Sequence, residues 1–147
     1  MLKQFLSIKQ KHLMNRILLI ALYIFSVNAV QAQKLQTSSY STKGYVKEDG
    51  KIQDETYGTV ATISNDGKIQ DNRYNTLGYI RDGKVQDNHY QTLGYINEDG
   101  RVQDNRYVTI GYIKDDGTVQ DNRYLTIGYA KGIKKEWAAI TFFFFKL

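Results

Sequence analysis

Five aspartates recur along the chain at intervals of 16–17 residues, each directly after a β-branched residue and a glutamine. They are Asp54, Asp71, Asp87, Asp104 and Asp121. Equivalent carboxylates that converge on an axis could hold a cation such as Ca²⁺, which takes about six to eight oxygen ligands. The alternative is local, because Asp and Asn side chains also bond to the backbone of their own turns. An asparagine follows four of the five aspartates, which favours the local role over a metal site.

Aromatic rings and planar cations recur as well, at the chain reversal that follows each aspartate. An aromatic face can stack on the apolar face of a sugar ring, while planar polar groups bind its hydroxyls. We therefore predict that a ligand, where one is bound, contacts Tyr74, Tyr90, Tyr107, Tyr124, Arg73, Arg106 and Arg123. A second set of tyrosines lies inside the repeats and is expected to serve packing: Tyr79, Tyr95, Tyr112 and Tyr129.

Acid–base and nucleophilic chemistry finds little support in these residues. Apart from His12 near the N-terminus, His89 is the only histidine, and the chain has no cysteine. His89 stands where other repeats carry arginine, and a catalytic histidine needs partners that orient it. The sequence predicts neither an enzyme nor a bound cofactor, and a hydrolase is the least favoured reading.

β-Hairpins must position these residues, because every repeat carries an Asp-Gly pair among β-branched and aromatic residues. Asp-Gly in that setting is a strong hairpin signal, since Gly adopts positive φ without steric cost. The predicted repeat units are 40–55, 56–72, 73–88, 89–105 and 106–122. Such units cannot bury an apolar face alone. We predict an all-β fold of five hairpins in a closed, pseudo-five-fold ring, with an open β-hairpin solenoid as the alternative.

A small residue recurs in the middle of each Thr-x-Gly-Tyr-Ile strand, as in Gly78, and alanine replaces it at Ala61. Gly inside a strand marks a bulge or the close approach of another group, and its repetition favours an approach near a common axis. The terminal segment 123–147 breaks the pattern and ends in an apolar run, 137–145. A run that is apolar on all sides should be buried. We predict that it is a Phe-rich strand, or a short helix, that plugs or closes the ring.

Residues 1–32 have the features of a secretory signal peptide. A basic start at Arg16 precedes an apolar run, 17–27, and a small-residue cleavage site that ends at Ala32. The run is too short to cross a bilayer, which needs about 20 residues. We predict cleavage after Ala32 and a single β-repeat domain, 33–147, without a transmembrane span. Translation from Met1 or from Met14 would both give this product.

The charge balance changes when that segment is removed. The chain has 20 Lys and Arg against 15 Asp and Glu, but four of the basic residues lie in residues 1–32, which leaves 16 against 15. Nucleic-acid binding needs a strongly basic surface. The near-neutral remainder therefore excludes nucleic acid as a partner.

The repeat phrase also resembles a known family. The chain resembles the exported 5-fold beta-flower repeat proteins of Bacteroidota-type bacteria in three features. These are five hairpins with the phrase Gly-Tyr-Ile-x-Asp-Gly-x-Val-Gln-Asp-Asn, a signal peptide and a Phe-rich C-terminal strand. The resemblance covers about residues 40–147, and the second repeat departs from it at Thr62. It implies a small all-β ring and supplies no catalytic residues.

These observations together predict a non-enzymatic exported protein of the periplasm, cell surface or medium. Its expected role is binding or scaffolding at the cell envelope, with a glycan or a protein as partner. The alternative is a purely structural or oligomerising module.

Overall fold

A computed structural model describes residues 10, 12–14, 16, 32–145 and 147, and residues 32–147 form one compact unit. Residues 10, 12–14 and 16 are helical. Most of the predicted signal peptide lies outside the described residues, and its cleavage stays a prediction. In the part of the chain that is described, no helix is both long and apolar enough to cross a membrane.

Twelve strands make up most of this unit. The first six are β1 (Gln33–Thr37), β2 (Thr42–Val46), β3 (Lys51–Gln53), β4 (Thr59–Ile63), β5 (Lys68–Asp71) and β6 (Thr76–Arg81). The others are β7 (Lys84–Asp87), β8 (Thr92–Ile96), β9 (Arg101–Asp104), β10 (Thr109–Ile113), β11 (Thr118–Asp121) and β12 (Thr126–Tyr129). A short α-helix, α2 (Lys135–Ala139), continues into a π-helical turn, η1 (Ile140–Phe144).

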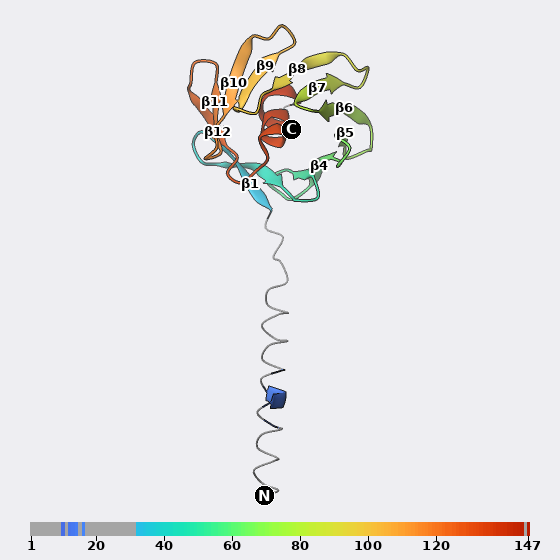
Figure 1. Ribbon diagram of the computed structural model, residues 1–147, viewed down its shortest axis with the longest axis vertical. Helices are drawn as coiled ribbons and strands as arrows, with labels where there is room; N and C mark the ends of the chain where they lie inside the picture. The colour runs from blue at the N-terminus through green and yellow to red at the C-terminus, as the bar shows by residue number, and fades with distance from the viewer. Residues whose placement is uncertain (1–9, 11, 15, 17–31, 146) are drawn as a thin grey trace, which may run out of the picture. The chain divides into compact units, whose positions relative to one another are not determined.

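The strands form a closed antiparallel barrel (Figure 1). Each strand pairs with its neighbours in sequence, and β1 pairs with both β2 and β12, so the two ends of the chain close the sheet. This confirms the all-β class and the closed arrangement, and it excludes the open solenoid. The predicted ring of five hairpins is incomplete, however. In the described residues β12 and β1 form a sixth strand pair, which lies between the first and the last Asp-Gly hairpin and closes the barrel.

The closing strand is a degenerate repeat that the sequence analysis missed. Leu35 and Gln36 precede Tyr40 at the same offsets at which Val85 and Gln86 precede Tyr90. Leu35 is 1% exposed and faces Gly44 of β2 in register, as Val85 faces Gly94. The spacing of Leu35, Gln36 and Tyr40 could have identified this strand. It is hard to recognise because Thr37-Ser38-Ser39 replaces the Asp-Asn-Arg motif of the other repeats.

Both ends of the barrel reverse the chain with a residue in the left-handed region. At one end this residue is glycine, as in Gly100 at φ 85°, and a Cβ there would overlap the carbonyl oxygen of Ile113. At the other end it is tyrosine, with φ between 63° and 66° at all six turns. The third Asp-Gly turn differs, because Asp82 and Gly83 both have positive φ and form a two-residue hairpin turn.

The inner face of the barrel carries the small and β-branched residues of each repeat. In β6, Gly78 and Ile80 are buried while Tyr79 between them is only partly covered, as strand alternation requires. The β-branched residues of the Gln-Asp strands are fully buried and belong to the same core: Ile52, Ile69, Val85, Val102 and Val119. Burying one such side chain contributes about 1.5–3 kcal/mol.

The Phe-rich segment is helical, so the predicted closing strand is wrong and the alternative of a short helix holds. The helix lies inside the ring of strands (Figure 1). Four of its residues are fully buried: Ala138, Ala139, Ile140 and Thr141. A helix bonds its own backbone, whereas a strand enclosed by an already paired sheet would leave its backbone groups unsatisfied.

The four phenylalanines each contact a different repeat. Phe142 lies against Gly128, Phe143 against Gly111, Phe144 against Gly94, and Phe145 against Gly78. A Cβ at any of these glycines would overlap both the ring and the carbonyl oxygen of a neighbouring strand. The register also shifts beside these glycines, as between Val119 and Gln120. The glycine therefore serves both predicted purposes, a bulge and a close approach.

Candidate functional site

The repeated aspartates brace their own turns. Asp71 accepts hydrogen bonds at Oδ1 from the backbone N–H of Arg73 and of Asn75, both at 2.8 Å. The other four aspartates make the same pair of contacts at 2.8–2.9 Å: Asp54, Asp87, Asp104 and Asp121. The hydrogen bond from the Asn75 side chain holds the pKa of Asp71 below its usual value. This is the local role that the Asp-Asn pairs favoured.

No metal-binding group emerges from these carboxylates. Within the described ranges, no three side chains of His, Cys, Asp or Glu are grouped so that they could hold one ion. His89 lies on an exposed turn and donates its backbone N–H to Asp87.

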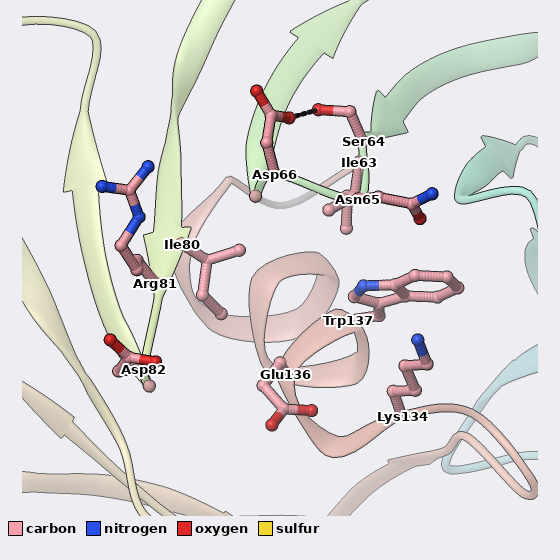
Figure 2. A pocket seen from close by; sticks show the side chains of 12 residues that line it. Ile63, Ser64, Asn65, Asp66, Ile80, Arg81, Asp82, Lys134, Glu136 and Trp137 are labelled. Atoms are coloured by element: carbon pink, nitrogen blue, oxygen red, sulfur yellow. Dashed lines mark hydrogen bonds between the residues drawn. The ribbon is translucent and has the colours of Figure 1, made fainter.

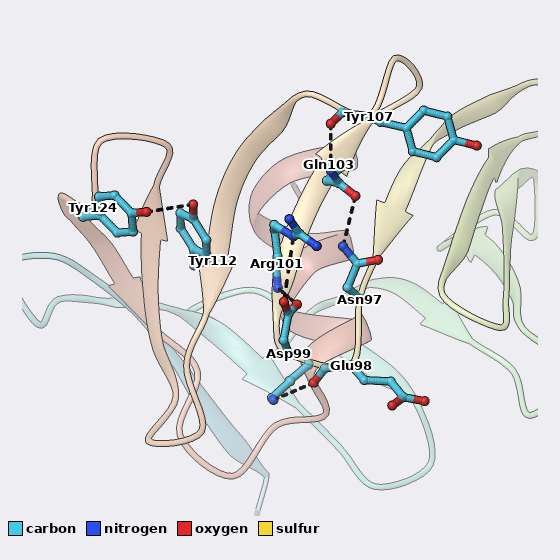
Figure 3. A network of polar contacts seen from close by, with 9 residues as sticks. Asn97, Glu98, Asp99, Arg101, Gln103, Tyr107, Tyr112 and Tyr124 are labelled. Carbon is cyan, nitrogen blue, oxygen red and sulfur yellow. Dashed lines mark hydrogen bonds and ion pairs between the residues drawn. The ribbon is translucent and has the colours of Figure 1, made fainter.

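The repeated glutamines hold the turn tyrosines in place. In every repeat the glutamine Nε2 donates to the carbonyl oxygen of the tyrosine four residues on, as from Gln86 to Tyr90 at 2.7 Å. The contact occurs six times, including from Gln36 to Tyr40 in the closing strand at 2.8 Å. Gln103 also accepts from Asn97 at 3.0 Å (Figure 3). Aspartate and glutamine together fix a left-handed conformation that an L-residue with a large side chain rarely adopts.

The turn tyrosines stack on the repeat tyrosines and form what we call the tyrosine belt. Five pairs have ring centroids 4.5–4.8 Å apart and planes within 15°: Tyr40–Tyr129, Tyr45–Tyr57, Tyr79–Tyr90, Tyr95–Tyr107 and Tyr112–Tyr124. Hydroxyl groups meet at 3.1–3.2 Å in three pairs, and Figure 3 shows this contact between Tyr112 and Tyr124. The structure thus joins the two tyrosine sets that the sequence analysis kept apart.

The belt remains accessible on its outer side. The five stacked turn tyrosines are 62–64% exposed. Arg106 and Arg123 are exposed on two of these turns, and Arg73 is exposed on the turn of Tyr74. The structure therefore brings the predicted ligand residues to one belt on the outside of the barrel.

One position of the belt is incomplete. Tyr74 is 83% exposed, because the second repeat carries Thr62 where the other repeats carry the stacking tyrosine. Lys51 faces Thr62 across the strand pair. Tyr74 keeps the left-handed backbone at φ 65° without a stacked ring to compensate for its cost.

Completing the sixth pair should stabilise the protein. We expect Thr62→Tyr to raise the free energy of unfolding by about 0.5–1.5 kcal/mol, which is the range for a stacked aromatic pair. Urea unfolding of the single variant and of Thr62→Tyr combined with Tyr74→Ala provides the measurement. If Thr62→Tyr raises the free energy of unfolding of the Tyr74→Ala protein by the same amount, stacking on Tyr74 is not the source of the gain.

Alkaline pH should weaken the belt. The hydrogen bond with the stacked partner raises the pKa of Tyr79, Tyr95 and Tyr112 above the ordinary value. These groups are neutral in the folded protein, so their contribution is complete below about pH 10 and is lost as pH rises through the raised pKa. We expect urea unfolding to show lower stability at pH 11 than at pH 8. The variant with phenylalanine at positions 90, 107 and 124 should lose less, and an equal loss would exclude the tyrosine pairs as the cause.

A groove lies at the opposite end of the barrel, where the Asp-Gly turns surround the start of α2. It has a volume of about 560 Å³, and its lining includes Asn65, Asp66, Asp82, Glu136 and Trp137. Figure 2 shows the indole of Trp137 between Lys134 and the turn that carries Asn65. The Lys134 ammonium lies 4.6 Å from the indole centroid. We predicted from the sequence that the apolar run 137–145 is buried, but no site at its first residue, Trp137.

A closed antiparallel barrel of short hairpins, with turn tyrosines outside and a helix within, defines a class of small β-repeat proteins. The chain belongs to the 5-fold beta-flower protein family, which matches residues 32–146. The match confirms the resemblance drawn from the repeat phrase. No curated protein and no solved structure matches the chain significantly.

Proposed function

We propose that the protein is an exported, non-enzymatic binding protein that attaches to a glycan at the cell envelope through the tyrosine belt. The observation that carries the proposal is the repeated exposure of turn tyrosines in a left-handed backbone conformation. Glycine occupies the corresponding turn position at the other end of the barrel, where no side chain is needed.

The energetics favour a purpose for the tyrosine side chains. A left-handed L-residue costs about 1–2 kcal/mol, and a stacked pair returns about 0.5–1.5 kcal/mol. Stacking therefore does no more than offset the strain, and at Tyr74 it offsets none of it. Exposed aromatic faces beside arginine guanidinium groups suit sugar rings, which offer apolar faces and hydroxyls.

The stacks also support a second candidate, a purely structural or oligomerising module. In that case the turn tyrosines would serve as packing between neighbouring repeats, and their exposed faces would meet another copy of the chain. Five of the six turn tyrosines do stack within the chain, which is the observation that favours this candidate.

Asparagine variants on a glycan array separate the two candidates. Asparagine tolerates the left-handed region, so Tyr90→Asn, Tyr107→Asn and Tyr124→Asn combined should keep the turns while removing the rings. We expect the wild-type chain 33–147 to bind and this variant to bind at least tenfold more weakly. Leu125→Asn is the control, because Leu125 is exposed beside Tyr124 but belongs to no pair.

The contrary results are equally clear. A wild-type chain that binds nothing on a broad array of envelope glycans, or a variant that binds unchanged, would refute the glycan role. Elution of chain 33–147 well above the monomer mass would then favour the oligomerising module. Mass spectrometry of protein exported by a bacterial host should find Gln33 as the first residue, and retention of residues 1–32 would refute export by cleavage.

A further inference from the structure

The groove beside Trp137 continues into a second hollow. That hollow has a volume of about 540 Å³ and is lined by residues that include Ile96, Asn97 and Glu98. Both hollows share Asp82, Gly83, Lys134 and Glu136. The third Asp-Gly turn therefore lies where they meet, and we call this combined feature the notch.

The notch coincides with the only change of repeat length. The turn at Asp82 and Gly83 is one residue shorter than its counterpart at 97–100, and it is a two-residue turn. In the longer turns the Gly N–H donates to a carbonyl three residues back, as from Gly100 to Asn97 at 2.9 Å. With one residue fewer, this turn fills less space beside the helix than the turns of the other repeats do.

The chemistry of the notch is mixed but acidic on balance. Its carboxylates are Asp66, Asp82, Glu98 and Glu136, and its cations are Arg81, Lys134 and Lys135. Lys135 is already engaged, because its ammonium lies 2.7 Å from an Asp115 carboxylate oxygen and donates to the Glu98 carbonyl at 3.1 Å. Lys134 covers one face of the indole. An acidic ligand would therefore meet repulsion from the carboxylates.

We propose that the notch is a second, single-copy binding site that takes a saccharide without acidic groups. The indole offers an aromatic surface for a sugar ring, while the carboxylates and the Asn65 and Asn97 amides offer hydrogen bonds to hydroxyls. Each hollow lies within the range of about 300–1,000 Å³ that is usual for small-molecule sites. The proposal shares the ligand class of the proposed function but places it at the opposite end of the barrel from the tyrosine turns.

Trp137 provides a reporter that is specific to the notch, because it is the only tryptophan in the chain. We expect the fluorescence of chain 33–147 to change saturably on titration with one of chitohexaose, cellohexaose, xylohexaose or mannohexaose. Oligogalacturonate, which carries carboxylates, should bind at least tenfold more weakly. Calorimetric titration with the same sugars checks for binding that leaves the fluorescence unchanged.

Two variants test the place of binding. Asp82→Asn keeps a residue that tolerates positive φ, and we expect it to weaken binding about tenfold. Asp116→Asn is its matched control, because Asp116 occupies an Asp-Gly turn that does not line the notch. A chain that carries the longer turn 97–100 in place of residues 81–83 should fill the notch and abolish binding without lowering Tm.

The outcomes distinguish this proposal from the proposed function. No saturable response to any neutral oligosaccharide overturns the notch site, and so does unchanged binding by the chain with the longer turn. Tighter binding of oligogalacturonate overturns the ligand class. The triple asparagine variant of the tyrosine belt should retain the fluorescence response, so failure of the belt leaves the notch result standing.

Discussion

Replacing Gly111 with alanine is expected to lower the free energy of unfolding by about 2–3 kcal/mol, in the range for overpacking a tight core. The added Cβ would overlap the Phe143 ring and the Gln120 carbonyl oxygen at once. The ring belongs to the central helix and the carbonyl to β11, so two separate elements must shift to make room for the Cβ. Urea unfolding at neutral pH measures the effect.

Two further variants show whether the ring is responsible. Phe143→Leu in the Gly111→Ala background should recover part of the loss, because a smaller side chain leaves room for the Cβ. Gly44→Ala should cost less than Gly111→Ala, because its Cβ would overlap a strand carbonyl oxygen but no phenylalanine ring. The second repeat already carries Ala61 at this position. Equal losses at Gly44 and Gly111 would mean that the phenylalanine contact is unimportant.

Removing β1 should open the barrel. A chain that begins at residue 38 lacks both ladders that join β12 to β2, together with the buried side chain of Leu35. Burial of Leu35 alone contributes about 1.5–3 kcal/mol. We therefore expect Tm to fall by at least about 10 °C relative to chain 33–147, as the usual ratio of stability to Tm implies.

Association is the second expected consequence of that deletion. β2 and β12 would each present an unpaired edge, and exposed edges pair with other chains. Size-exclusion chromatography should show oligomers of chain 38–147 but not of chain 33–147. A monomeric deletion chain with an unchanged melting curve would show that β1 is not needed for closure.

Most of the fold could be predicted from the repeat phrase, because strand and turn signals are local. Asp-Gly between β-branched residues places a hairpin tip whatever the rest of the chain does. The closing strand could not be found in this way. Ser38 and Ser39 stand where most other repeats have Asn and Arg, and only the spacing of Gln36 and Tyr40 is retained. The Phe-rich segment has strand composition but forms a helix, because closure of the sheet leaves no edge for it to join.

The candidate sites divide in the same way. The role of Asp71 in its turn follows from local chemistry and was favoured from the sequence alone. The stacking of Tyr79 on Tyr90 depends on how one repeat lies beside the next, which periodicity does not specify. The notch forms because Trp137 lies near the one shortened turn. Trp137 and Asp82 of that turn are 55 residues apart in the sequence, so local patterns do not bring them together.

The one-to-one contact between phenylalanines and glycines bears on how such a chain can evolve. Repeat arrays usually grow or shrink by duplication and loss of whole units. Here Phe142 through Phe145 meet Gly128, Gly111, Gly94 and Gly78 in reverse chain order, one ring to one repeat. A hairpin duplicated among these four units would enter the ring with no phenylalanine to meet it and would displace the pairing of the units beside it. The tail therefore constrains the number of repeats between Gly78 and Gly128, and a change in that number would leave rings and glycines mismatched.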